Sequence, residues 1–158
     1  MITHPFDPYI NKESRFLILG TFPSVKSREN NFYYSHKRNR FFPILCSIYN
    51  EPLPLSIEDK KKLLDKYHIA LYDVIYSCDI VNSDDSSIKN VIPIDIATLL
   101  KEYPSITKIG ITGKKAAKLF DKYLKDKVVI PVIYLPSTSP ANAKISLEQL
   151  ISDYSQLL

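Results

Sequence analysis

Four short apolar runs recur along the chain and predict the strands of one sheet. Each run is almost continuously apolar and rich in β-branched residues, which is typical of strands buried on both faces of a parallel sheet. Because proline cannot donate a ladder hydrogen bond, we expect Pro131 to delay the last strand until Val132. The four runs are Phe16–Leu19, Ile69–Ile75, Lys108–Ile111 and Val128–Leu135.

Amphipathic segments alternate with these runs and predict helices. Ser56 precedes residues 57–67 as an N-cap, with carboxylates in the first turn, and Glu148 lies near a capping-box position in the last segment. The order of elements predicts an α/β fold, namely a three-layer α/β/α sandwich around a four-stranded, mostly parallel sheet, in one domain over residues 1–158. The expected helices are Phe41–Tyr49, residues 57–67, Asp95–Glu102, Lys114–Lys125 and Ser146–Leu158.

The composition is that of an ordinary globular protein, with 45% apolar and 24% charged residues. No apolar run approaches the roughly 20 residues needed to span a bilayer, and no basic start followed by an apolar stretch marks a signal peptide. Cys46 and Cys78 are too few for a disulfide framework and too isolated for a zinc site. We therefore expect a cytoplasmic, reduced protein with no metal and no membrane partner.

The excess positive charge is concentrated in one segment. Residues 26–40 contain five basic side chains and one acidic side chain, an excess equal to the net charge of +4 for the whole chain. Such a patch fits the phosphates of a nucleic acid or a nucleotide. A solvated basic loop explains the charge equally well, so charge alone favours neither function.

Ligands of parallel sheets bind beyond the carboxyl ends of the strands. We therefore expect a binding site among the segments that follow the four apolar runs. The last of them, LPSTSPANA, offers hydroxyls near a helix start, which suits a phosphate or simply a capping turn. TGKK lacks the GxxxxG spacing of a phosphate loop, so we expect Lys114 and Lys115 to face solvent. NNFYYSHKRNR places aromatic residues beside cations, as in proteins that stack on bases while holding the backbone.

Three segments taken together resemble the uracil-DNA glycosylase superfamily, and most closely its hypoxanthine DNA glycosylases. They are GTFPS at 20–24, YYSHKRNRF at 33–41 and LPSTSPANA at 135–143, where the family typically carries G-S-[FM]-P-[GS], a YYAHPRN-x-FW-like segment and LPSTSPA. Thr21, Lys37 and Phe42 depart from these patterns without removing a polar group that the chemistry needs. The resemblance implies an α/β/α sandwich and a monomer, without a cofactor, that acts on DNA containing a deaminated base.

The resemblance also implies roles for individual residues. Other branches carry a catalytic Asp or Asn where this chain has Phe22, and the water-positioning role then passes to the side-chain carbonyl of Asn39. Tyr34 corresponds to the aromatic residue that stacks on the extruded base, although a core tyrosine is the alternative. His36 donates to the leaving base or steadies the loop. The remaining implied contacts are Gly20, Thr21, Phe22, Pro23 and Ser24 at the base, Arg38, Arg40, Ser137, Thr138 and Ser139 at the DNA backbone, and Asn142 or Ile145 in the gap left in the duplex.

Asp73 follows the apolar run IALY and corresponds to the specificity asparagine of uracil enzymes. An ionised carboxylate only accepts hydrogen bonds. Hypoxanthine presents a ring N–H on its Watson–Crick edge where adenine presents a bare acceptor, so Asp73 would favour hypoxanthine. An aspartate that caps a turn is the alternative.

Three functions remain open from the sequence. The first is a monofunctional DNA glycosylase for hypoxanthine, with uracil or xanthine as other substrates, since no lysine stands out as a nucleophile. The second is a non-catalytic nucleic-acid-binding protein of the same fold, which Phe22 leaves open. A nucleotide-binding α/β protein is disfavoured because the phosphate-loop spacing is missing.

Overall fold

The central sheet of the computed structural model, which describes residues 1–158, has four parallel strands in the order β3-β2-β6-β7. Gly20 at the end of β2 lies opposite Asp73 at the end of β3, so the carboxyl ends of these strands are level. The predicted four-stranded parallel sheet is confirmed, and its last strand begins at Val132 as expected. The strands are β2 (Phe16–Gly20), β3 (Ile69–Asp73), β6 (Lys108–Thr112) and β7 (Val132–Leu135).

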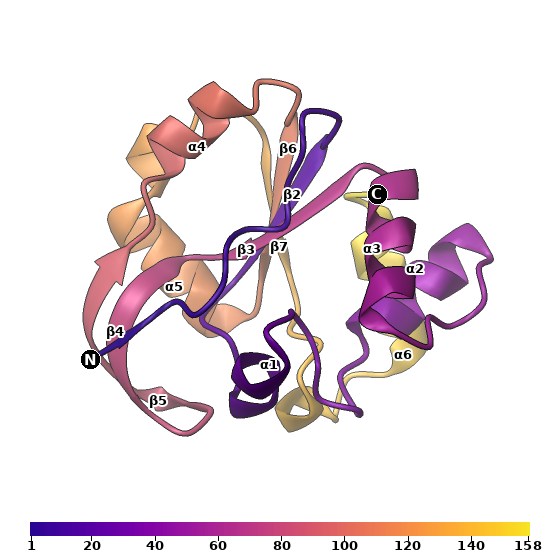
Figure 1. The fold of residues 1–158 in the computed structure, drawn as a ribbon, viewed down its shortest axis with the longest axis horizontal. Helices are drawn as coiled ribbons and strands as arrows, with labels where there is room; N and C mark the ends of the chain where they lie inside the picture. Colours follow the sequence, from indigo (N-terminus) through magenta and orange to yellow (C-terminus); the bar gives the residue numbers. More distant parts are fainter.

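Helices cover both faces of this sheet and bury its apolar strands (Figure 1). One face carries α4 (Ile96–Glu102) and α5 (Lys114–Tyr123), and the other carries α2 (Phe41–Tyr49), α3 (Ile57–Lys66) and α6 (Leu147–Ser155). Ser56 and Ser146 cap α3 and α6 by accepting from the backbone N–H groups of Asp59 and Gln149. The α/β/α layering predicted from the sequence is therefore present. None of the helices is long and apolar enough to cross a membrane.

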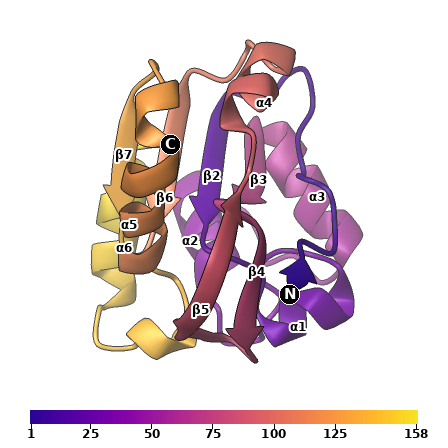
Figure 2. The same cartoon turned by 90° about the vertical axis from the view of Figure 1, so that its left-hand side faces the viewer.

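A second, antiparallel sheet was not predicted. It has the order β1-β4-β5 and consists of β1 (Ile2–Thr3), β4 (Ile75–Val81) and β5 (Asp84–Pro93). Figure 2 shows the β4–β5 hairpin in front of the central sheet. The single run expected at Ile69–Ile75 was wrong at its end, because β3 stops at Asp73 and Ile75 already belongs to β4. Three register shifts along the hairpin disturb the alternation of apolar and polar residues by which a strand is normally recognised.

The tip of this hairpin is fastened to a helix that also escaped prediction, α1 (Val25–Asn30). The backbone N–H of Val25 donates to Ser83 Oγ at 2.9 Å, and the Arg28 guanidinium donates to the Asn82 carbonyl. Arg28 belongs to the basic segment, yet it holds two parts of the protein together. The hairpin and α1 therefore lie against each other beyond the carboxyl end of β2.

Candidate active site

A cavity of about 380 Å³ opens at the carboxyl ends of β2, β3 and β6. The chain passes from β2 to β3 on one side and then to β6 on the other, which is the switch point where open α/β sheets bind ligands. The cavity brings together most of the predicted site residues, whereas Arg38, Arg40 and Asn142 lie outside its lining. The predicted residues that line it are Gly20, Thr21, Phe22, Pro23, Ser24, Tyr34, His36, Asn39, Asp73, Ser137, Thr138 and Ser139.

Asp73 is a buried carboxylate in the lining of this cavity. Its Oδ2 atom lies 2.8 Å from Nε2 of His4, and both side chains are almost fully buried, at 8% and 1% exposure. Its Oδ1 atom lies beside Gly20, where an added Cβ would approach to 2.7 Å. One oxygen is thus used inside the protein, and the other lies where the absence of a side chain at residue 20 leaves room.

Tyr34 has an uncommon backbone conformation, with φ of 53° in the left-handed region. Such a conformation costs a non-glycine residue about 1–3 kcal/mol and persists where the surrounding structure imposes it. One face of its ring stacks on Phe41, with centroids 4.1 Å apart, so that face is closed to a ligand. Burial raises the pKa of Tyr34, and the negative charge of Asp73 adds to the rise, so the phenol stays neutral.

Asn39 has its side-chain orientation fixed by two hydrogen bonds to the same oxygen. Its Oδ1 atom accepts from the backbone N–H of Phe41 and from the hydroxyl of Thr138, each at 2.9 Å. A carbonyl oxygen has two lone pairs, and both are used here. The sequence suggested that this carbonyl would orient water, but in the structure the NH₂ group is the part of Asn39 left for a ligand.

Thr138 was predicted as a DNA contact, yet it is 2% exposed and donates to Asn39. His36 lies nearby in the lining and accepts the backbone N–H of Arg38 at Nδ1, at 3.1 Å. The proton of a neutral His36 ring is therefore on Nε2. Asn39 and His36 accordingly each keep an N–H group as a donor.

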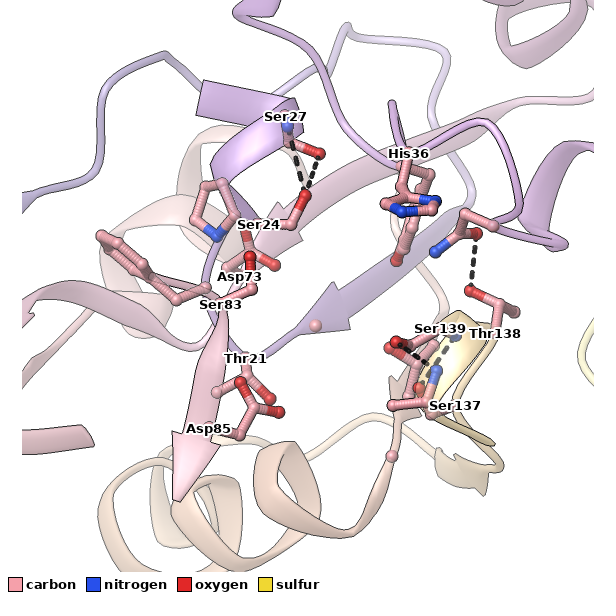
Figure 3. A pocket seen from close by; sticks show the side chains of 18 of the residues that line it. Thr21, Ser24, Ser27, His36, Asp73, Ser83, Asp85, Ser137, Thr138 and Ser139 are labelled. Atoms are coloured by element: carbon pink, nitrogen blue, oxygen red, sulfur yellow. Dashed lines mark hydrogen bonds between the residues drawn. The ribbon is translucent and has the colours of Figure 1, made fainter. Parts of the chain in front are cut away.

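The wall of the cavity next to Thr138 carries Ser137 and Ser139 (Figure 3). Ser137 Oγ accepts from the backbone of Ser139 at 3.1 Å, and Ser139 Oγ accepts from the backbone of Ala141 at 3.2 Å. Because backbone N–H groups satisfy these oxygens, both hydroxyl hydrogens remain free to donate. α5 starts next to Ser137 after Gly113, without a side-chain cap, so its first N–H groups add to an environment that suits an anion.

Lys114 and Lys115 line this cavity, so the expectation that they face solvent was wrong for Lys115, which is half-buried. Lys114 is exposed at the rim. The error arose because the sequence does not reveal that α5 begins at the mouth of the cavity. The two lysines add positive charge to the lining of the cavity.

The β4–β5 hairpin supplies Ile80, Ser83 and Asp85 to the cavity, and none of the three was predicted. Figure 3 shows the Asp85 carboxyl directed into the cavity near Thr21. Desolvation raises the pKa of Asp85, nearby Lys115 opposes the rise, and the charge of Asp73 adds to it. No group of three His, Cys, Asp or Glu side chains is placed to hold a metal ion.

His4 is the most important residue that the sequence did not reveal. It lies 69 positions before Asp73, and a single histidine between Thr3 and Pro5 gives no local signal of function. Only the pairing of β1 with β4 brings it behind the end of β3.

Comparison with known proteins identifies the family of this chain. The sequence matches the family model of the uracil DNA glycosylase superfamily over residues 8–154. The chain belongs to this superfamily. Two curated relatives, from Methanosarcina acetivorans and Methanosarcina barkeri, are each named hypoxanthine DNA glycosylase. The first is 29% identical over 147 residues, covering 92% of both chains, and the second is 30% identical over 115 residues, covering 72% of both.

A solved structure from the same superfamily has the same overall fold. It is a solution NMR structure from Methanosarcina acetivorans, whose description proposes a uracil DNA glycosylase. It is 27% identical to this chain, with a TM-score of 0.81 over 99% of each chain.

Within this member of the uracil DNA glycosylase superfamily, the two arginines on either side of Asn39, namely Arg38 and Arg40, differ in their surroundings. The Arg40 guanidinium donates to the carbonyls of Ile145 and Asn142 at 2.7 and 3.0 Å, which fastens the loop to the C-terminal segment. Arg38 is exposed. The Asn142 side chain donates to the Ser137 carbonyl at 3.0 Å, so it too is held inside the protein.

We expect Arg38→Gln to weaken DNA binding and to reduce the salt dependence of log Kd by about one phosphate contact. Arg40→Gln is expected to lower the free energy of unfolding by about 1–3 kcal/mol, because two carbonyls lose a charged donor. Salt titrations of DNA binding and urea unfolding measure the two effects. A larger loss of stability for Arg38→Gln than for Arg40→Gln would contradict this division.

Proposed function

We propose that this protein is a monofunctional DNA glycosylase that excises hypoxanthine from DNA, with uracil and xanthine as other substrates, and so starts base excision repair. The observation that carries the proposal is the buried Asp73 carboxylate, whose Oδ1 lies beside Gly20 in a cavity also lined by Asn39. Superfamily membership and the two relatives named hypoxanthine DNA glycosylase support it.

Excision requires the base to leave the duplex, because its glycosidic bond is inaccessible inside the stack. The cavity of about 380 Å³ is within the range of small-ligand sites and has aromatic residues in its lining to replace lost stacking. Tyr34 offers the ring face that Phe41 does not cover. The extruded base would lie with its Watson–Crick edge toward Asp73.

Asp73 would then select among purines. Hypoxanthine donates its ring N–H to the carboxylate, whereas adenine presents a lone pair at the same position and would be repelled. Uracil also carries a ring N–H between two carbonyls, which is why it remains a second substrate. Selection of this kind is strong because a buried polar group is left unpaired by the wrong base.

Cleavage of the bond between the sugar and the base leaves the bonding electrons on the base and positive character on the sugar. A water molecule held by the Asn39 NH₂ group would add its oxygen to the anomeric carbon and lose a proton. The departing base gains a proton, so the products are hypoxanthine and an abasic site. His36 would donate a hydrogen bond through Nε2 as negative charge develops on the base, since its Nδ1 atom already accepts the Arg38 backbone N–H.

The phosphates beside the extruded nucleotide would be held by Ser137, Ser139 and the start of α5. The hydroxyl hydrogens of the two serines and the first backbone N–H groups of α5 could bind a phosphate without breaking a hydrogen bond within the protein. Lys115 lines the same cavity and adds positive charge to it. We assign this lysine to phosphate binding and not to attack on the sugar.

Purified protein incubated with end-labelled duplexes that contain one hypoxanthine, uracil or xanthine tests the proposal, with alkali used to reveal abasic sites. We expect cleavage at hypoxanthine, and no protein–DNA adduct when borohydride is added to trap an imine. An adduct would assign Lys115 or Lys114 as a nucleophile and overturn the monofunctional mechanism. Cleavage only at uracil would keep the class and overturn the purine assignment, and binding without cleavage of any substrate would indicate a non-catalytic member.

A further inference from the structure

A histidine lies directly behind the carboxylate to which we assign recognition of the base. His4 Nε2 is 2.8 Å from Asp73 Oδ2, and its side chain is 1% exposed. His4 does not line the cavity, so a bound base would not touch it. Its place is set by β1, since Thr3 pairs with Ser77 and the His4 backbone N–H donates to the Tyr76 carbonyl at 2.6 Å.

The surroundings of the ring decide which of its two nitrogens donates a hydrogen bond. His4 Nδ1 is buried and has no hydrogen-bond partner. The ring is packed among aromatic side chains, namely Phe6, Phe22, Tyr33 and Tyr72. A hydrogen on Nδ1 would be a buried donor without an acceptor, which is costly. The tautomer with its hydrogen on Nε2 fits instead, and it donates to Asp73 Oδ2.

This hydrogen bond makes the two oxygens of Asp73 unequal. Oδ2 is held by His4, which restricts rotation of the carboxylate, and Oδ1 remains beside Gly20. The cavity therefore receives one well-placed acceptor from Asp73. Hypoxanthine has one N–H on its Watson–Crick edge, whereas guanine has a ring N–H and an amino group and needs two acceptors side by side.

We propose that His4 is a positioning residue that fixes Asp73 as a single acceptor for the N–H of hypoxanthine; this rests on the proposed function. With Oδ2 held by His4, Oδ1 would accept the ring N–H of hypoxanthine and would face the bare lone pair that adenine presents at the same position. His4 disfavours guanine, whose amino group would be buried without the second acceptor that a freely rotating carboxylate could offer.

Two substitutions of His4 test the proposal through the rate of hypoxanthine release in single-turnover assays. Gln can place its amide N–H near the position of Nε2, whereas Met has a similar length and no donor. We expect His4→Gln to keep most of the wild-type rate and His4→Met to lose about ten- to a hundredfold, the range for a hydrogen bond to a charged group. Phe6→Leu is the matched control, because Phe6 packs on His4 with centroids 4.9 Å apart without a hydrogen bond to Asp73.

Thermal unfolding of all four proteins separates positioning from packing. We expect Phe6→Leu to lose stability while retaining the wild-type rate of release. An active wild type together with an equally active His4→Met would overturn this inference and leave the proposed function standing. Equal losses in His4→Gln and His4→Met, or in Phe6→Leu and His4→Met, would also overturn it, since the effect would then follow packing. A wild type that releases no hypoxanthine would overturn the proposed function, and the inference with it.

Discussion

Asn39→Ala is expected to slow hypoxanthine release by about a hundred- to a thousandfold, the loss typical when one positioned donor is removed from an active site. The structure leaves only the NH₂ group of Asn39 free, because the Phe41 N–H and the Thr138 hydroxyl occupy its oxygen. Binding to a duplex that contains an abasic analogue should change little. Single-turnover release and fluorescence anisotropy measure the two quantities.

Asn39→Asp is the matched control for this prediction. The carboxylate keeps the oxygen that accepts from Phe41 and Thr138, so stability should stay close to that of the wild type, but the N–H donor is lost. We expect Asn39→Asp to be as slow as Asn39→Ala. A fast Asn39→Asp enzyme would show that this position acts as an acceptor or a base, and would contradict the donor role that the hydrogen bonds indicate.

Gly20→Ala is expected to reduce hypoxanthine release by at least about a hundredfold, because the new methyl group takes the space beside Asp73 Oδ1, the atom that we propose binds the base. The added Cβ would lie 2.7 Å from Asp73 Oδ1 and 3.8 Å from the Tyr34 hydroxyl. Asp73 cannot retreat freely, since His4 holds its other oxygen at 2.8 Å. The measurement is the rate of release under conditions in which the variant is folded.

Gly110→Ala provides a control with similar crowding away from the cavity. A Cβ at Gly110 in β6 would lie 2.5 Å from Leu157 Cδ2 and 3.1 Å from Leu135 Cδ1. Overpacking of this kind costs about 1–3 kcal/mol in stability, and we expect both variants to unfold at lower urea concentration than the wild type. Only Gly20→Ala should lose activity; equal losses in both would attribute the effect to stability alone.

The central sheet was predictable because its strands are buried on both faces and their apolar residues are contiguous. Leu17, Ile18 and Leu19 have no exposed surface, and helices pack on either side. A cap residue gave the start of α3 for a local reason, since the Ser56 side chain accepts from the backbone N–H three residues later. Helix caps and continuously apolar strands are therefore features that can be recognised in a single sequence.

The hairpin and the connections within the site were not predictable for the opposite reason. β4 and β5 carry register shifts and the polar run Asp84–Ser87, so neither alternation nor strand propensity marks them. The bonds that orient Asn39 and Asp73 join residues 99 and 69 positions apart. The sequence resemblance could name Asn39 and Asp73, but it could not say which of their atoms are already used.

β1 is only two residues long, and its attachment to the edge of the hairpin has a consequence for dynamics. A two-residue strand at the edge of a sheet opens locally at a small fraction of the cost of global unfolding. When Ile2 and Thr3 leave β4, His4 is no longer held in place, although the four-stranded sheet stays intact. Hydrogen exchange at the His4 amide would then report a folded state in which Asp73 lacks the hydrogen bond that we propose positions it.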